Sequence, residues 1–322
     1  MDFEEISKKL HLEVSNELKI IQGGNSSVVK AKLEDDRLVA VKIYKGEPSR
    51  IQRMLAREQS AISYLTGNGF QNIPEILEVR TDLGLIVYRW IEGEPPIPNT
   101  KCMEAIIEMC LALNNVNKKD DFENAVDAAF SIQDIEFQIL ERINLLRSEH
   151  TYQFAKTVCL SLEEKLQKYK YIFGNNQKLF PHTISVSDLG THNMLYAGSN
   201  FKFIDFEFFG RDSVDKMVGD FLLHPHNKFK QNEIVKFKES IANKLGWQSK
   251  NLNFILPILS LKWAAIAFKR ELKELEISYS EESLKVFLYT SKGMKYLEYF
   301  EYLISGEPVD SVSTFNQFTA KI

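Results

Sequence analysis

The hydrophobic periodicity changes once along this 322-residue chain, and that change constrains the fold more than any other feature of the sequence. Before the polar, proline-rich segment Glu92–Thr100, short runs rich in β-branched residues alternate with turn signals, as in antiparallel hairpins. After it, apolar residues recur three and four positions apart, as on one face of a helix. We therefore predict an α+β protein with two lobes, residues 1–91 and 92–322.

The first lobe is predicted to be an antiparallel sheet with one helix. Three strands are expected over Leu18–Gln22, Val28–Glu34 and Leu38–Tyr44, and two more within EILEVRT and GLIVYRWIEG. The helix is expected between Ser49 as N-cap and Gly67 as its stop. The second lobe is predicted to be mainly α-helical, with helices over Lys101–Asn117, Asp134–Arg147, Thr151–Tyr171, Asn232–Leu245, Leu252–Leu275 and Glu281–Leu303.

Composition indicates an ordinary globular protein and excludes several classes of partner. Hydrophobic residues make up 44% of the chain and charged residues 26%, with a net charge of -4 and no long basic block, so we expect no nucleic-acid surface. No run of about 18 uninterrupted apolar residues and no secretory signal is present, so we expect no membrane partner and a cytoplasmic location. Three cysteines without a C-x-x-C pair are expected to be reduced and buried.

Lys42 and Glu58 are charged residues at positions where the pattern predicts a core. Lys42 interrupts the apolar run VAVKIY, and Glu58 falls on the apolar stripe of the first helix. Either residue alone fits a snorkelling or stripe-edge position. Together, they favour a buried ion pair, because an unpaired charge at either site is costly. Just before this strand, GGNSS (Gly23, Gly24, Asn25, Ser26, Ser27) is either a hairpin turn or a loop that covers phosphates.

The segment from Val186 to Gly210 places three oxygen-bearing side chains among apolar residues. Asp188 and Asn193 are five positions apart in a loop, and Asp205 ends the strand FKFI. Each residue alone fits a turn. Together, Asn193 and Asp205 suit a hard cation such as Mg²⁺, and Asp188 suits proton transfer from a hydroxyl group. Glu207 either assists a second metal ion or holds the loop.

These residues resemble the motifs of the aminoglycoside phosphotransferase and choline kinase family, which has a protein-kinase-like fold. VSDLGTHN and DFE stand where the family carries H-G-D-x-x-x-x-N and D-F-E. The resemblance implies transfer of the γ-phosphoryl group of ATP, with Mg²⁺, to a hydroxyl of a small-molecule acceptor. It implies that Asp188 is catalytic, that Asn193 and Asp205 bind Mg²⁺, and that Lys42, held by Glu58, binds the α- and β-phosphates.

The resemblance extends to the hinge and to the segment after DFE. It implies an adenine pocket beside Tyr88, with backbone contacts from Arg89, Trp90 and Ile91, and ATP between the two lobes. It also makes Asp220 a brace of the catalytic loop. The family's His-Gly before the aspartate is Val186 and Ser187 here.

That departure keeps a nucleotide-binding pseudokinase open as an alternative. Two others are a nucleotidyl transferase and a metal-dependent hydrolase built on Asp188, His192, Asp205 and His224. The sequence determines neither the acceptor nor the oligomeric state. The acidic segment Glu271–Ser283 fits either a cationic acceptor or a solvated helix end.

Overall fold

The computed structural model describes residues 12–13, 20–114, 122–150, 152–174, 182–278, 280–305 and 314–320. The chain forms two compact units. The first contains Met1–Ile97 and Thr191–Gly210, and the second contains Pro98–Gly190 and Arg211–Ile322. These units group residues by contact, whereas the predicted lobes are continuous stretches of chain, so the division between residues 91 and 92 stays a prediction.

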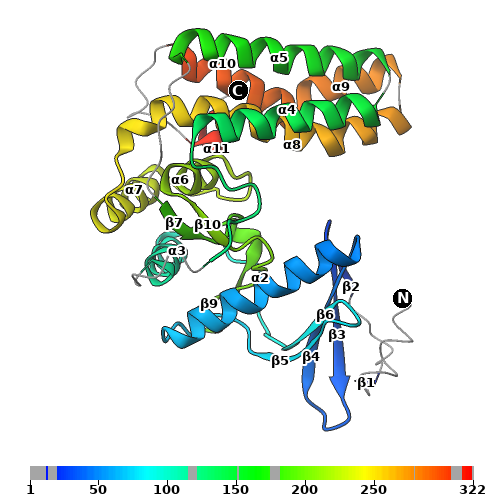
Figure 1. Ribbon diagram of the computed structural model, residues 1–322, viewed down its shortest axis with the longest axis vertical. Coiled ribbons are helices and arrows are strands. Elements are labelled where there is room, and N and C mark those ends of the chain that lie inside the picture. Colours follow the sequence, from blue (N-terminus) through cyan, green and yellow to red (C-terminus); the bar gives the residue numbers. More distant parts are fainter. Residues whose placement is uncertain are drawn as a thin grey trace. The chain divides into compact units, whose positions relative to one another are not determined.

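The first unit is built on one antiparallel sheet, as predicted (Figure 1). Its strand order is β1-β3-β4-β6-β5, and β2 also pairs with β3. The strands are β1 (Leu12–Glu13), β2 (Ile20–Gln22), β3 (Ser26–Leu33), β4 (Leu38–Tyr44), β5 (Ile76–Arg80) and β6 (Leu85–Arg89).

Strand alternation gives this sheet one apolar face and one face with polar groups. Val39 and Val41 are fully buried in a core cluster with Leu85 and Val87. Lys42 lies opposite Ile86 in the β4–β6 ladder and points to the other face. If β4 shifted by one residue relative to its neighbours, its two faces would be exchanged and Lys42 would enter the apolar cluster. Burial therefore strongly specifies the register of β4.

Helix α2 (Pro48–Gly67) is the single helix predicted for the first lobe. Its buried residues include Leu55, Glu58 and Ile62, as its apolar stripe indicates. The predicted N-cap at Ser49 is wrong, because the helix begins at Pro48, with Glu47 as its N-cap. Proline suits the first helical position, since its missing N–H would have no partner there and its φ is already helical.

The first unit also contains a hairpin from later in the chain. It consists of β8 (Met194–Ala197) and β9 (Asn200–Phe203), preceded by the short 3-10 helix η2 (Thr191–Asn193). The Phe203 N–H donates to the Asn72 carbonyl at 2.8 Å. Tyr196 exchanges backbone hydrogen bonds with Glu94, whose neighbour Gly93 has no room for a Cβ, which would lie 2.9 Å from the Tyr196 carbonyl oxygen.

The second unit is mainly helical, as predicted. Helix α8 packs against α4, α5, α6 and α10, and the strands β7 and β10 form a small sheet (Figure 1). The elements are α3 (Thr100–Leu113), α4 (Ile132–Glu149), α5 (Gln153–Phe173), β7 (His182–Ser185), β10 (Gly210–Ser213), α6 (Val214–Leu223), α7 (Gln231–Leu245), η3 (Ser249–Asn251), α8 (Leu252–Ile277), α9 (Glu281–Thr290), α10 (Lys292–Ile304) and α11 (Phe315–Thr319).

Two helical details differ from the prediction. The segment expected to be one helix over Glu281–Leu303 is two helices, because Ser291 ends α9 and its side chain accepts a hydrogen bond from the Met294 N–H to begin α10. Helix α6 was not predicted. Its ten residues are all buried, and the helix is shorter than the about 11 to 18 residues in which periodicity is read.

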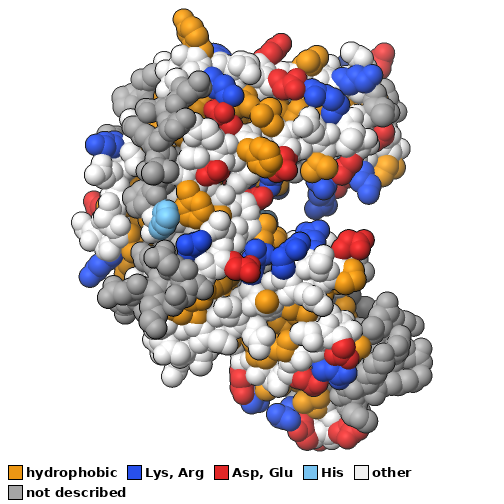
Figure 2. Space-filling view, viewed as in Figure 1, with side chains coloured by type: hydrophobic (Ala, Val, Ile, Leu, Met, Phe, Trp, Pro, Cys, Tyr) orange, Lys and Arg blue, Asp and Glu red, His pale blue; other side chains and the backbone are white. Residues whose placement is uncertain are grey.

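The surface and the cysteines agree with a globular protein. Among the described residues, Ser249–Ile277 is long and apolar enough to cross a membrane, but 67% of its most apolar window is buried inside the protein, as in a core helix. Acidic and basic side chains are interspersed on the face in Figure 2. The three cysteines are free and buried, as predicted.

Candidate active site

The first unit contains a lysine held among three carboxylates. Lys42 Nζ lies 2.7 Å from Glu58 Oε2, 2.7 Å from Asp205 Oδ1 and 3.2 Å from Glu207 Oε2. The side chains of Lys42, Glu58 and Glu207 are at most 5% exposed, whereas that of Asp205 is 36% exposed. The predicted ion pair between Lys42 and Glu58 is therefore present, and the structure adds both acids of DFE to it.

Burial and charge oppose each other in this cluster. Burial lowers the pKa of Lys42, but the three carboxylates outweigh it and the pKa is raised. Burial raises the pKa of Glu207 above its ordinary value, although Lys42 partly counteracts this. Glu58 is additionally fixed by two tyrosine hydroxyls, from Tyr44 and, at 2.6 Å, from Tyr88. The ammonium is thus held charged and in place.

The glycine-containing turn is connected to the same cluster. Gly23 and Gly24 are exposed, and the Gly23 N–H donates to the Ser26 carbonyl at 2.9 Å. Asn25 Nδ2 donates to Glu207 Oε1 at 2.8 Å, while its Oδ1 accepts from Arg50. Ser26 and Ser27 begin β3. The turn is therefore anchored at Asn25 and open at its glycines, and its predicted role in phosphate binding stays a prediction.

Asn193 and Asp205 flank the β8–β9 hairpin at the same end. The Asn193 carbonyl accepts from the Ile204 N–H at 2.9 Å, one residue before Asp205. Asp205 has φ +67°, a left-handed conformation that costs a non-glycine residue about 1 to 2 kcal/mol. Their amide and carboxylate oxygens are the ligand type that Mg²⁺ prefers. Two further carboxylates lie close to Asp205, because ligand atoms of Glu58, Asp205 and Glu207 all lie within 4.8 Å of one another.

The hinge residues have backbone partners of their own. The Arg89 N–H donates to the Glu75 carbonyl, and the Trp90 N–H donates to the Leu38 carbonyl. Tyr88 is buried and directed to Glu58. The N–H groups of Arg89 and Trp90 are therefore already paired within the protein, and the backbone contacts of Arg89, Trp90 and Ile91 to adenine stay a prediction.

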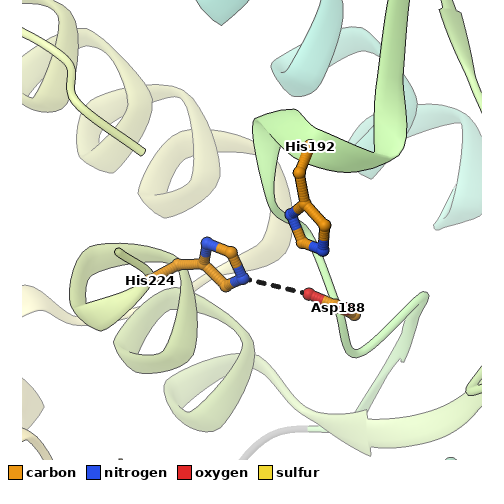
Figure 3. A group of neighbouring side chains, drawn as sticks. All are labelled: Asp188, His192 and His224. Atoms are coloured by element: carbon orange, nitrogen blue, oxygen red, sulfur yellow. Dashed lines mark ion pairs between the residues drawn. The ribbon is translucent and has the colours of Figure 1, made fainter. Parts of the chain in front are cut away.

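In the second unit, Asp188 stands after a strained turn. Ser187 has φ +61°, and the Asp188 N–H donates to the Val186 carbonyl at 2.8 Å, which is the bond of a γ-turn. Ser187 occupies the position where the resembling family has glycine, and it keeps a backbone conformation typical of glycine. Asp188 Oδ1 lies 3.1 Å from His224 Nε2, and the dashed line in Figure 3 marks this contact.

Two residues hold this loop; sequence reasoning missed Asn227 and named His224 only in the hydrolase alternative. Asn227 Nδ2 donates to the Leu189 carbonyl at 3.0 Å, and His224 contacts Asp188. Asp220, the expected brace, has Lys216 at 2.9 Å and Trp263 Nε1 at 2.9 Å as its partners, so its predicted role in bracing the loop stays a prediction. Lys216 also binds Asp212 at 2.8 Å. The spacing of four between Asp212, Lys216 and Asp220 was a usable signal for helix α6.

An open cavity lies between α4 and α8. Its volume is 810 Å³, and its charged lining residues are Asp127, Glu141, Arg142 and Lys269. Acidic and basic side chains are equally represented there, so the lining does not select a cationic acceptor. Within the acidic segment named above, Glu271 caps α10, since its carboxylate accepts from Ser291 and from the N–H groups of Lys292 and Gly293.

Comparison with solved structures identifies the fold. No protein-family model matches the sequence, and no curated protein matches it. A spectinomycin phosphotransferase, APH(9)-Ia, solved with ADP and spectinomycin, aligns with a TM-score of 0.59 at 13% identity over 98% of this chain and 96% of its own. The chain has the protein-kinase-like fold.

Two kinase-like relatives of different specificity align equally well. The choline kinase LicA from Streptococcus pneumoniae has a TM-score of 0.59 at 14% identity, covering 92% of this chain and 97% of its own. A choline/ethanolamine kinase family protein from Mesorhizobium loti has a TM-score of 0.59 at 16% identity, covering 99% and 98%. The family resemblance drawn from the sequence is thus confirmed at the level of the fold, and the identities leave the acceptor open.

Proposed function

We propose that this protein is a Mg²⁺-dependent phosphotransferase that moves the γ-phosphoryl group of ATP to a hydroxyl of a small molecule. The observation that carries the proposal is Lys42, whose ammonium bridges Glu58 and Asp205 at 2.7 Å each. A lysine for phosphate binding and an aspartate for metal binding are thereby adjacent, under a turn whose glycines are exposed.

Each group has a defined part in this proposal. The turn Gly23–Ser27 covers the phosphates, Lys42 contacts them, and Glu58 keeps Lys42 in place. Asn193 and Asp205 would hold Mg²⁺, which would neutralise charge on the transferring group. Asp188 accepts the hydroxyl proton while the acceptor oxygen bonds to the γ-phosphorus and the bond to the β-phosphate oxygen breaks, releasing ADP.

The proposed acceptor is an aminoglycoside, amino-alcohol or sugar-like molecule, and the proposed location is the cytoplasm, without a nucleic-acid or membrane partner. The similar spectinomycin phosphotransferase supports a small polar acceptor, since its structure was solved in complex with spectinomycin. Catalysis of phosphoryl transfer depends mainly on positioning the reacting groups and on stabilising their charge, so a few fixed side chains suffice.

Calorimetry tests the proposal. We expect ATP to bind with Mg²⁺, and we expect Asp205→Ala to lose the Mg²⁺-dependent part of the binding. The exposed variant Lys45→Met serves as the matched control, because it removes a charge next to the site without touching the cluster. If ATP binds wild type under no condition, the phosphotransferase proposal is wrong.

Product analysis separates the remaining alternatives. A pseudokinase binds ATP without consuming it, and a nucleotidyl transferase releases pyrophosphate in place of ADP. The hydrolase alternative predicts bound Zn²⁺ or Mn²⁺ in the purified protein, which elemental analysis would detect.

A further inference from the structure

His224 is the first residue after helix α6, and its ring is directed to Asp188 (Figure 3). The distance from Nε2 to Asp188 Oδ1 is 3.1 Å. The His224 side chain is 7% exposed, whereas that of Asp188 is 31% exposed. His224 therefore contacts one oxygen of the Asp188 carboxylate, while the Asp188 side chain remains partly exposed to solvent.

The other ring nitrogen determines the tautomer. His224 Nδ1 accepts a hydrogen bond from the backbone N–H of His226 at 3.2 Å. A nitrogen that accepts carries no proton, so the neutral ring is protonated at Nε2. His224 consequently donates to Asp188, and a hydrogen bond donated to an ionised carboxylate is about twice as strong as a neutral one.

The ring is fixed by a buried polar chain. It stands edge-on to the Trp263 indole, with centroids 5.3 Å apart and an interplanar angle of 86°. Trp263 Nε1 donates to Asp220, and Asp220 is held by the fully buried Lys216. The pKa of Asp220 is lowered, because Lys216 and Lys262 outweigh the effect of burial. The partners of His224 are therefore themselves immobilised.

The backbone of His224 is fixed as well. Its carbonyl accepts from Asn316 Nδ2 at 3.0 Å and from the Asn227 N–H at 3.1 Å. The Asn227 side chain reaches the Leu189 carbonyl, next to Asp188. Two side chains from the same helix end thus hold the catalytic loop, one at the carboxylate and one at the backbone.

We propose that His224 is a positioning residue for Asp188. Its Nε2–H holds Oδ1, which orients the carboxylate that accepts the hydroxyl proton. The inference rests on the proposed function, since it gives Asp188 the catalytic role. It also accounts for Val186 and Ser187 in place of His-Gly, because the brace comes from α6 and not from the residues before the aspartate.

Two substitutions separate orientation from packing. His224→Leu removes the donor but keeps an apolar contact for Trp263, whereas His224→Gln keeps an N–H donor near the position of Nε2. His226→Ala is the matched control, because His226 is exposed and donates to Nδ1 through its backbone, which the substitution retains. The assay is ADP release from ATP and Mg²⁺ with water as acceptor, together with nitrogen NMR of the histidine rings.

We expect His224→Leu to lower kcat about 10- to 100-fold, the size typical of a lost orienting partner, with KM for ATP within twofold of wild type. His224→Gln should recover most of kcat, and NMR should show His224 protonated at Nε2. Unchanged kcat in His224→Leu, or a ring protonated at Nδ1, would overturn the inference. A wild type that binds no ATP and releases no ADP would instead refute the proposed function, and the tautomer would still decide whether the contact exists.

Discussion

Replacing Lys42 by methionine tests the electrostatics of the site most directly. Methionine preserves most of the buried side-chain volume but removes the only cation among Glu58, Asp205 and Glu207 that the described structure contains. Glu58 keeps its two tyrosine donors, whereas Glu207 keeps only the amide of Asn25. The variant therefore leaves buried negative charge without a counter-ion.

The expected loss in the free energy of unfolding is about 3 to 4 kcal/mol at pH 7, because breaking a buried ion pair typically costs about 3 to 5 kcal/mol. Asp205 adds little to this figure, since its side chain is 36% exposed and solvent screens it. Lys45→Met is the control. Lys45 is exposed, so its replacement should change the free energy by less than about 0.5 kcal/mol.

The loss should depend on pH in a defined direction. The pKa of Glu207 is raised by burial, and Lys42 counteracts that rise, so the pKa rises further in the variant. A carboxyl group whose folded pKa exceeds its unfolded value contributes stability at low pH and loses it as the pH rises through the folded pKa. The deficit of Lys42→Met should therefore be smaller at pH 5 than at pH 7.

Urea denaturation followed by circular dichroism measures these differences, and the m-values show whether the variants unfold in the same way. A deficit at pH 7 below about 1 kcal/mol, well under the usual cost of a broken buried pair, would refute the reasoning. So would equal deficits at pH 5 and pH 7, since the cost would then not come from ionised carboxylates.

Three further variants test other parts of the structure. Asp188→Asn should lower kcat for ADP release about 10²- to 10⁴-fold with nearly unchanged ATP affinity by calorimetry, and retained turnover would remove Asp188 as the catalytic base. Ser187→Gly should leave the free energy of unfolding unchanged or raise it by about 1 kcal/mol, since it relieves a left-handed φ of +61°; a lower Tm would contradict this. Gly219→Ala should destabilise by about 1 to 2 kcal/mol, because the new Cβ would lie 2.4 Å from Leu259 Cδ1, and the control Gly67→Ala, which has open space, should lower no Tm.

Local chemistry made much of the first unit predictable. Alternation and turn residues indicated its strands, and the position of Lys42 within an apolar strand indicated its partner Glu58. Helix α6 was missed although the spacing of Asp212, Lys216 and Asp220 signals it, because its ten residues are fewer than the about 11 to 18 in which periodicity is read. The N-cap was wrongly predicted at Ser49 because serine suits an N-cap and proline suits the first helical position, so the two neighbouring residues gave different starts for the helix.

The sequence by itself determined which groups carry charge inside the protein, because a lysine or carboxylate within an apolar pattern needs a partner wherever it folds. Only the tertiary structure decided which partners these are. Asp205 and Glu207 join Lys42 through a hairpin far along the chain, since Lys42 and Asp205 are separated by 163 residues. His224 reaches Asp188 because the end of α6 is packed against the loop, and contacts across such separations leave no local pattern in a single chain.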